Sequence, residues 1–484
     1  MSIAGYCVLA VLLSAVSPDV FAKTAEEKHF ENGILLYKDG KYKEAFGELE
    51  QAGKLSPDRA EAYLRLGMIY AIQKRYDKAL DAYERAAALH PKGMTAGWAH
   101  FGLADIYYAK GMLEDSFLEL EKGIKTVPDY AYAYAQIARI FRRKGLYDQA
   151  IVECEKALKL ESGNAAARDT LGDIYLSQKK YDKAAAVLTE AIKLDPAYPR
   201  AHYTLGRLYH DLGKIPEALR EIAQAVRLDP RQTVFYKGLG AIYQEQSRYS
   251  EAVDILKKAL ALDPYAVDVM GMLANAYDMN GEHHNALKTY RRILGLDPGS
   301  SEAHTGLALV FGKKGRYENA IVECRKALQL SPDDIPVRII LADVYVLQRK
   351  SDRALVLLNE ALKIDPEYAL VHYALGRAYH KKGRQDQAIN ECLRAVLIDP
   401  ESALFYAGLG GVYRDYRMYD RAVESLKKAI EFDPHFIEAF RRLGDAYMGK
   451  GMYEEAAKAY ESALTVKPVP FVYGIKRLKK IQSE

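Results

Sequence analysis

One pattern of about thirty residues recurs along most of the chain at a fixed interval, and this regularity constrains the fold more than any other feature. The pattern is clearest from Ala201 to Pro230, in the stretch AHYTLGRLYHDLGKIPEALREIAQAVRLDP. Apolar residues recur there at spacings of three, four and seven, first around Leu205 and again around Ile222, as they do on amphipathic helices. The stretch therefore predicts two short helices.

Gly213 and Pro230 should end these two helices. Glycine adopts the left-handed backbone that terminates many helices, and proline lacks the N–H that a continuing helix needs. Each helix would have about 14 residues and a length of roughly 21 Å, which is too short for stability alone in water. We expect each helix to depend on packing against its neighbours.

The small residues indicate where the two helices cross. Gly206 and Ala218 should face each other, because a large side chain at either would push the helix axes apart. With Pro199 as position 1, the stretch resembles the tetratricopeptide repeat, whose period is 34 residues, and departs from it at position 4, where His202 replaces the preferred tryptophan. The matching residues are Leu205, Gly206, Tyr209, Ala218, Ile222, Ala225 and Pro230.

The proline that closes the unit recurs at steps of 34 or 68 residues, with one exception. Ser162 stands at the midpoint of the double step, and the irregular step from Pro91 to Pro128 holds three extra residues, placed at residues 94–96. The resemblance implies about thirteen units within residues 26–470, in an all-α, right-handed superhelical solenoid of antiparallel helix pairs. The prolines are Pro57, Pro91, Pro128, Pro196, Pro230, Pro264, Pro298, Pro332, Pro366, Pro400, Pro434 and Pro468.

Composition agrees with a helical array, and charge argues against two classes of partner. The chain is 49% hydrophobic and 28% charged. Its 69 basic and 65 acidic residues leave a net charge of +4, too small for a field that would attract nucleic acid or an anionic membrane. Neither nucleic acid nor a lipid surface is favoured as a partner.

The first residues do not belong to the array. Residues 6–16, YCVLAVLLSAV, form an apolar run, and a turn-forming Ser17-Pro18-Asp19 follows it. This is the layout of a secretory signal peptide over residues 1–22, with cleavage after Ala22, and the run is too short to span a membrane. We therefore expect a periplasmic or secreted protein. No Lys or Arg precedes the run, so an apolar N-terminal extension of a cytoplasmic protein is the alternative.

The cysteines and the C-terminus offer no further chemistry. Cys154, Cys324 and Cys392 share the repeat position of Ile222, and we expect them to be small buried hydrophobic residues. No pair of cysteines has the spacing of metal ligands, and no disulfide framework is expected. Residues 471–484, FVYGIKRLKKIQSE, are expected to form a C-terminal capping helix.

A longer period of 170 residues, or five repeats, lies on top of the first. AIVECEKALKL from Ala150 is echoed by AIVECRKALQL from Ala320, and HYTLGRLYH from His202 by HYALGRAYH from His372. An ungapped alignment of residues 131–300 with 301–470 gives about 68 identities, roughly 40%, which exceeds what the repeat consensus alone would give. The two blocks are interpreted as the products of one duplication.

The informative identities between the blocks lie outside the consensus. In tetratricopeptide repeats, positions 5, 9 and 12 of the first helix project into the concave groove that usually holds ligands, so the resemblance implies a groove location for residues there. An aromatic ring, a forked cation and a titratable ring on one helix face suit an acidic peptide or a sugar ring. The identical pairs are Asp173 with Asp343, Tyr203 with Tyr373, Arg207 with Arg377, and His210 with His380.

A structural role is the alternative for the charged members. Position 9 of four consecutive units reads Asp105, Arg139, Asp173 and Arg207, and these residues could neutralise one another across adjacent helices.

Aromatic residues of the N-terminal units form a second candidate surface. Trp98, Tyr108 and Tyr132 fall at first-helix groove positions, where they could contact a peptide or a glycan. Most of the 37 tyrosines, in contrast, stand at packing positions of the repeat.

No motif points to catalysis, a cofactor or a metal. The chain has no GxxxxGK[ST] phosphate loop, no HExxH, no nucleophile elbow and no catalytic Cys/His pair. The clamp with which some members of the family grip chaperone C-termini is also missing, because Lys237 holds its fifth position but Ala241 holds the ninth. We predict a chain without enzymatic activity.

The sequence thus predicts an interaction scaffold. By analogy with exported bacterial members of the family, we expect the groove to hold a protein or peptide partner within an envelope assembly or export system. A cytosolic adaptor is one alternative. A glycan-binding accessory subunit of a polysaccharide transferase or export machine is another, and it is favoured if Trp98, Tyr108, Tyr203 and Tyr373 all face an open groove.

Overall fold

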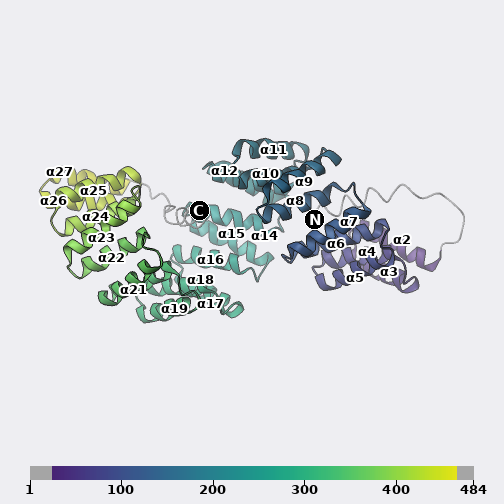
Figure 1. Cartoon of the computed structure of the whole chain (residues 1–484), viewed down its shortest axis with the longest axis horizontal. Coiled ribbons are helices and arrows are strands. Elements are labelled where there is room, and N and C mark those ends of the chain that lie inside the picture. Colours follow the sequence, from purple (N-terminus) through teal and green to yellow (C-terminus); the bar gives the residue numbers. More distant parts are fainter. Residues whose placement is uncertain (1–23, 466–484) are drawn as a thin grey trace. The chain divides into compact units, whose positions relative to one another are not determined.

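The computed structural model describes residues 24–465, and all of their regular structure is helical, in twenty-six helices from α2 to α27. Figure 1 shows them following one another as hairpins. The prediction of an all-α chain of helix pairs is confirmed. The predicted signal peptide, residues 1–22, and the predicted capping helix, residues 471–484, lie outside the described residues.

The chain divides into two compact units, and the first is Met1–Arg231. Its repeats begin with the first helices α2 (Ala25–Lys38), α4 (Ala60–Ile72), α6 (Met94–Ala109), α8 (Ala131–Arg143), α10 (Ala165–Ser177) and α12 (Pro199–Asp211). The second helices are α3 (Tyr42–Leu55), α5 (Tyr76–Leu89), α7 (Leu113–Thr126), α9 (Tyr147–Leu160), α11 (Tyr181–Leu194) and α13 (Ile215–Leu228).

The second unit is Gln232–Glu484. Its first helices are α14 (Thr233–Glu245), α16 (Val267–Met279), α18 (Ser301–Lys313), α20 (Ile335–Leu347), α22 (Ala369–Lys381), α24 (Ala403–Asp415) and α26 (Ile437–Lys450). Its second helices are α15 (Tyr249–Leu262), α17 (His283–Leu296), α19 (Tyr317–Leu330), α21 (Ser351–Ile364), α23 (Gln385–Ile398), α25 (Tyr419–Phe432) and α27 (Tyr453–Thr465).

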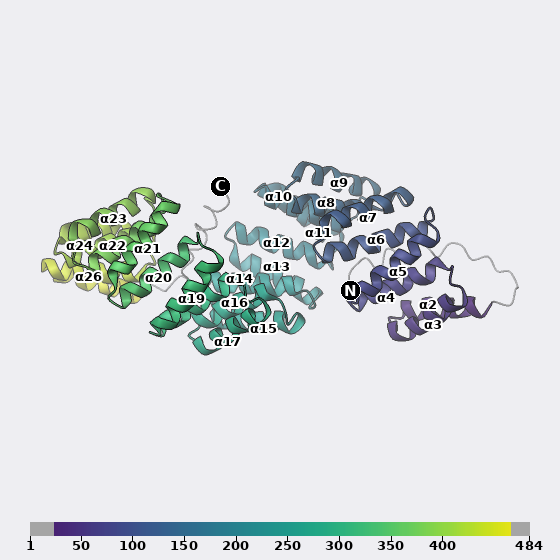
Figure 2. The same ribbon diagram turned by 60° about the horizontal axis from the view of Figure 1, so that its bottom comes forward.

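Each first helix packs against the second helix of its own repeat, and first helices of successive repeats also contact one another. In the first unit such contacts join α8, α10 and α12, and in the second they run from α14 to α26 (Figure 1, Figure 2). The surface that these adjacent first helices share is named here the first-helix face of each unit. Side chains from three consecutive repeats can meet on it.

At the crossing of α12 and α13, position 8 is a glycine that allows a close approach, as predicted for Gly206. A Cβ atom on Gly206 would lie 2.5 Å from Cγ1 of Ile222 and 3.1 Å from the carbonyl oxygen of Ala218. Ala218 and Ile222 are themselves fully buried. The backbones of α12 and α13 therefore approach as closely as they can only because position 8 has no side chain.

At position 4, five repeats carry histidine in place of the usual tryptophan. Nδ1 of His202 lies 2.8 Å from Oε2 of Glu221 on α13, and its Nε2 lies 3.2 Å from the carbonyl oxygen of Pro196. His202 therefore ties its helix to the partner helix and to the preceding turn by polar contacts. The same histidine–glutamate contact, nineteen residues apart, joins His29 to Glu48, His100 to Glu119, His304 to Glu323, and His372 to Glu391.

The irregular repeat and the cysteines both behave as the sequence indicates. α6 has 16 residues where most other first helices have 13, so the three extra residues extend its N-terminal end. Cys154, Cys324 and Cys392 are completely buried, and burial raises the pKa of each thiol to about 12. They are packing residues with little thiolate character.

The turn between the two helices of a repeat requires a left-handed residue. Eight repeats meet this requirement with glycine, for example Gly213 at φ 74°. Five others place an ordinary residue in the same conformation, namely Lys74, Lys179, Ser247, Arg349 and Arg417. A side chain in this region costs roughly 1–2 kcal/mol, which glycine avoids.

We predict that Lys179→Gly stabilises the first unit by about 1 kcal/mol, because it relieves a left-handed residue at φ 58°. Urea unfolding followed by circular dichroism would measure the change. Lys180→Gly is the matched control, since Lys180 has φ −85° and gains nothing from glycine. Equal effects of the two substitutions would contradict the prediction.

Candidate partner-binding site

The first predicted patch is centred on a carboxylate that two arginines share. Asp173 lies on α10, and its side chain is only 5% exposed. Its Oδ1 accepts a hydrogen bond of 2.7 Å from Nη1 of Arg207 on α12, and its Oδ2 lies 3.1 Å from Nε of Arg142 on α8. Burial acts to lower the pKa of Arg207, but Asp173, Tyr203 and Asp211 together outweigh it and the pKa is raised.

The equivalent patch of the second unit has a single ion pair. Asp343 on α20 lies 3.1 Å from Nη1 of Arg377 on α22, and the Asp343 side chain is 34% exposed. Burial raises the pKa of Asp343, although Arg377 acts in the opposite direction. Gly312 stands where the first unit has Arg142. Both patches thus contain the ion pair that the structural alternative expects, and their contact with a ligand stays a prediction.

The tyrosines of the two patches are partly buried rather than openly displayed. The ring of Tyr373 packs against Phe405 with 5.5 Å between centroids, and the guanidinium of Arg377 lies 5.8 Å from its centre. Tyr203 has the equivalent place on α12. Tyr373 therefore acts at least partly in packing.

The two histidines of the patches each lie near an acidic residue. Nδ1 of His210 is 3.5 Å from Oδ1 of Asp211, and Nε2 of His380 is 3.0 Å from Oδ2 of Asp415. Asp211 belongs to the same helix as His210, and Asp415 belongs to the repeat that follows His380. Each histidine of the two patches thus has a carboxylate nearby.

Three more residues, Asp169, Thr204 and Arg200, belong to the first patch, although the comparison of the two blocks did not select them. Asp169 on α10 is 1% exposed, and it accepts hydrogen bonds from Oγ1 of Thr204 at 2.6 Å and from Nε of Arg200 at 3.1 Å, both on α12. The comparison selected residues that are identical between the blocks, but Ile339 and Leu370 stand at the positions of Asp169 and Arg200. Asp169 and Arg200 are both replaced by apolar residues in the second block, and this paired replacement could have indicated that they contact each other.

These residues form one group around α10. We name it the α10 cluster, and its charged members are Asp169, Asp173, Arg142, Arg200 and Arg207.

The aromatic residues of α6 and α8 pack mainly against one another. Trp98 meets Tyr130 edge-to-face at 4.6 Å and Phe101 at 5.7 Å, and Tyr132 lies 5.5 Å from Tyr130. A sugar would therefore find these rings already engaged with other rings.

Tyr108 is engaged in a different way. The guanidinium groups of Arg139 and Arg143 lie 4.8 Å and 5.3 Å from the centre of its ring, within the range of cation–π contacts. The structure therefore does not bring Trp98, Tyr108 and Tyr132 together as one open aromatic platform.

Asp105 does not pair directly with Arg139, contrary to the predicted ladder. Its Oδ1 accepts hydrogen bonds of 3.0 Å from Oη of Tyr132 and Nε2 of Gln136, and Nη1 of Arg139 donates to Oε1 of Gln136 at 2.7 Å. Burial raises the pKa of Asp105 to about 6, despite the opposing hydrogen bonds and the charge of Arg139. The ladder fails here because Gln136 lies between the two charges.

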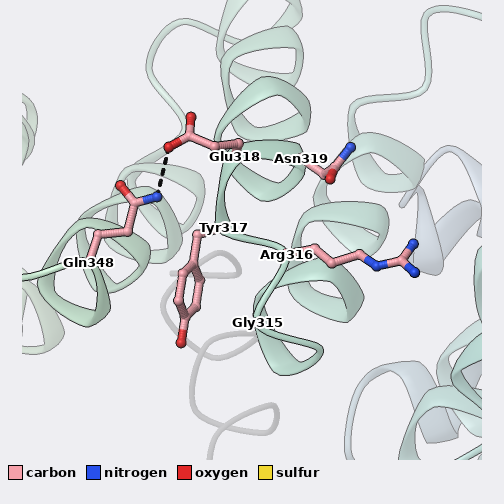
Figure 3. A pocket seen from close by; sticks show the side chains of 6 residues that line it. All are labelled: Gly315, Arg316, Tyr317, Glu318, Asn319 and Gln348. Atoms are coloured by element: carbon pink, nitrogen blue, oxygen red, sulfur yellow. Dashed lines mark hydrogen bonds between the residues drawn. The ribbon is translucent and has the colours of Figure 1, made fainter.

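A shallow pocket of about 380 Å³ lies on the second unit, away from groove positions 5, 9 and 12. Figure 3 shows Nε2 of Gln348 donating to Oε1 of Glu318, at 2.9 Å, while Arg316 and Asn319 extend to the opposite side. The pocket is a recess between the turns of adjacent repeats, and part of its polar lining already joins them. Its lining residues are Gly315, Arg316, Tyr317, Glu318, Asn319 and Gln348.

Comparison with protein families decides the identity of the repeats. One model described as tetratricopeptide repeat matches residues 70–140, 141–188, 243–310 and 414–470, about half of the chain. The chain is a tetratricopeptide repeat (TPR) protein. Other models described as TPR repeat or tetratricopeptide repeat match residues 30–93, 172–213, 203–267, 301–334, 342–383 and 369–402.

Chains of several solved structures are similar to this one at low sequence identity. The APC/C hetero-tetramer Cut9–Hcn1 matches with 14% identity and a TM-score of 0.43, over 95% of this chain and 96% of that one. Yeast Tom70 matches with 18% identity and a TM-score of 0.47, over 88% and 97%. MamA matches with 28% identity and a TM-score of 0.28, over 38% and 95%. Comparison with curated proteins gave no match.

The TPR architecture is that of a protein-interaction scaffold, and TPR proteins bind protein partners. Within residues 24–465, no helix of this TPR protein is long and apolar enough to cross a membrane.

We predict that Asp105→Asn stabilises the protein more at pH 8 than at pH 4.5. The folded-state pKa of about 6 lies above the unfolded value of roughly 3.9, so the folded state binds the extra proton and stability falls as the pH rises through this window, by up to about 3 kcal/mol. Asparagine cannot ionise and keeps the acceptor for Tyr132. Thermal unfolding of both proteins at the two pH values tests this, and a difference independent of pH would contradict it.

We predict that Asp173→Asn costs about 3 kcal/mol of unfolding free energy, whereas Asp343→Asn costs less than about 1 kcal/mol. The first change leaves Arg142 and Arg207 without their buried counter-charge, and the second removes one partly exposed pair. The two variants serve as controls for each other in urea unfolding at pH 7. Equal losses of unfolding free energy would show that the second arginine beside Asp173 does not add to the cost of losing that carboxylate.

Proposed function

We propose that this TPR protein is a non-catalytic scaffold of the bacterial cell envelope, which is exported to the periplasm and holds protein or peptide partners on its first-helix face. It would act there as part of an assembly or export system. The observation that carries the proposal is the set of arginine side chains on α8 and α12, which remain partly exposed on a face shared by three repeats. The apolar run of residues 6–16 supports export.

A first-helix face suits an extended partner for a geometric reason. Adjacent packed helices are roughly 8–10 Å apart, and an extended chain advances about 3.3 Å per residue, so every third residue of a partner would meet a new repeat. Affinity would then come from several modest contacts in series, as is usual when a peptide binds along a repeat array.

The glycan-binding alternative has less support. It required Trp98, Tyr108, Tyr203 and Tyr373 to face an open groove, but Tyr108 lies beneath two arginines and Tyr373 packs against Phe405. The cytosolic adaptor differs only in location, so it is separated from the proposal by the fate of the N-terminal segment.

The proposal is tested by expressing the full chain with a C-terminal tag in a bacterial host, with a photo-crosslinking residue at Tyr203 on α12. We expect a mature protein that begins at Lys23, recovered from the periplasm, and crosslinks to a protein. The matched control carries the crosslinker at Val152, which is 49% exposed on the second helix α9.

An intact Met1 in the cytosol would overturn the export claim and favour the adaptor. Equal crosslinking from Tyr203 and Val152 would overturn the claim that the first-helix face is the binding surface.

A further inference from the structure

The α10 cluster contains more positive than negative charge. Three guanidinium groups, from Arg142, Arg200 and Arg207, surround the two carboxylates of Asp169 and Asp173. Each of these arginines makes one ion-pair contact with the cluster, through Nε or Nη1, although a guanidinium carries five N–H donors. The cluster therefore holds unused donors as well as an unbalanced charge.

The negative charges of the cluster lie deeper than its positive charges. The two carboxylates are 1% and 5% exposed, whereas the side chains of Arg142, Arg200 and Arg207 are 24%, 38% and 41% exposed. The buried carboxylates hold the guanidinium groups in place, while the arginine side chains stay partly in contact with solvent. The guanidinium groups are already held in place, so less side-chain entropy would be lost when an anion binds to them.

Neighbouring charges extend this field and limit it. Arg139 and Arg143, over Tyr108, add positive charge along α8. Asp211, at the end of α12 and 45% exposed, offsets part of it. The excess charge is thus local to the faces of α8, α10 and α12, which agrees with the nearly balanced charge of the whole chain.

The second block of the duplication lacks the cluster. Gly312, Ile339 and Leu370 stand at the positions of Arg142, Asp169 and Arg200, and only the pair of Asp343 and Arg377 is kept. The repeat fold is therefore built without these charges in one block. Because packing does not require the cluster, ligand recognition is the better physical reason for it.

We propose that the α10 cluster binds an acidic peptide segment, whose Glu or Asp side chains are held by Arg142, Arg200 and Arg207. This inference rests on the proposed scaffold function and names the chemistry of its partner. A peptide fits better than a membrane surface, since the arginine side chains are more than half buried and a bilayer would need them to stand out. Carboxylates match the guanidinium fork in shape and charge.

The test is fluorescence anisotropy of the full chain with a labelled peptide of ten glutamates, compared with a peptide of ten glutamines. We expect binding of the glutamate peptide alone, weakening as salt is raised from about 50 to 200 mM because exposed charges are screened. Absence of binding, or equal binding of the two peptides, would overturn the inference. So would binding to phosphatidylglycerol vesicles without binding to the peptide.

The decisive variant copies the second block into the first. Asp169→Ile with Arg200→Leu recreates a combination that this fold already contains, and Arg142→Gln is added to remove the third charge. We expect at least tenfold weaker binding of the glutamate peptide, with a melting curve that shows a folded protein. The matched control is Arg377→Gln in the second unit, which should change affinity less than twofold.

If the triple variant does not fold, Arg142→Gln alone keeps Arg207 on Asp173 and should weaken binding severalfold. Unchanged binding in the folded triple variant would overturn the inference. If the triple variant has lost the glutamate peptide but still crosslinks its cellular partners through Tyr203, the scaffold function stands and only the acidic-peptide assignment is wrong. If crosslinking is lost together with peptide binding, both are supported.

Discussion

The close approach of two short helices at position 8 is the contact on which the whole array depends. Helices of 13 to 16 residues gain little stability alone, so each repeat must bury its apolar side against a neighbour. Gly206 permits that approach because any Cβ there would collide with Ile222. The same requirement commits the consensus positions of every repeat to packing and leaves the other side of the first helix free to vary. The residues that bind partners must therefore lie on that free side.

The two similar blocks, residues 131–300 and 301–470, show how far the free side can change while the packing stays the same. In one block α10 and α12 hold Asp169 and Arg200, and in the other the same positions hold Ile339 and Leu370. Because each repeat contacts mainly its neighbours, such a change is absorbed locally and leaves distant repeats untouched. Two similar blocks with one fold thus present different surfaces, and a scaffold built in this way can hold partners of different chemistry.

The sequence predicted the fold better than the site, for reasons that particular residues make clear. Gly206, Ala218 and Gly213 act over one helix crossing or one turn, so their spacing alone gives their structural role. The α10 cluster depends on contacts about one repeat apart, such as Arg200 to Asp169, which no local pattern reveals. Comparing the blocks for identical residues selected Arg207. It did not select Asp169 and Arg200, because these residues differ between the blocks. The aromatic prediction was weaker for a related reason, since spacing does not show whether a ring such as Tyr108 is covered.

The energetics of buried charge give the α10 cluster its significance. Removing two charges from water costs several kcal/mol, and replacing a buried ion pair by apolar residues of similar size is often neutral or stabilising. The second block carries that apolar replacement at Ile339 and Leu370. The first block therefore keeps buried charges at positions where the same fold accepts apolar residues. It also keeps one more arginine than pairing requires, and leaves each arginine side chain partly exposed. Structural pairing explains the buried carboxylates but not the excess cation, whereas recognition of an anion explains both.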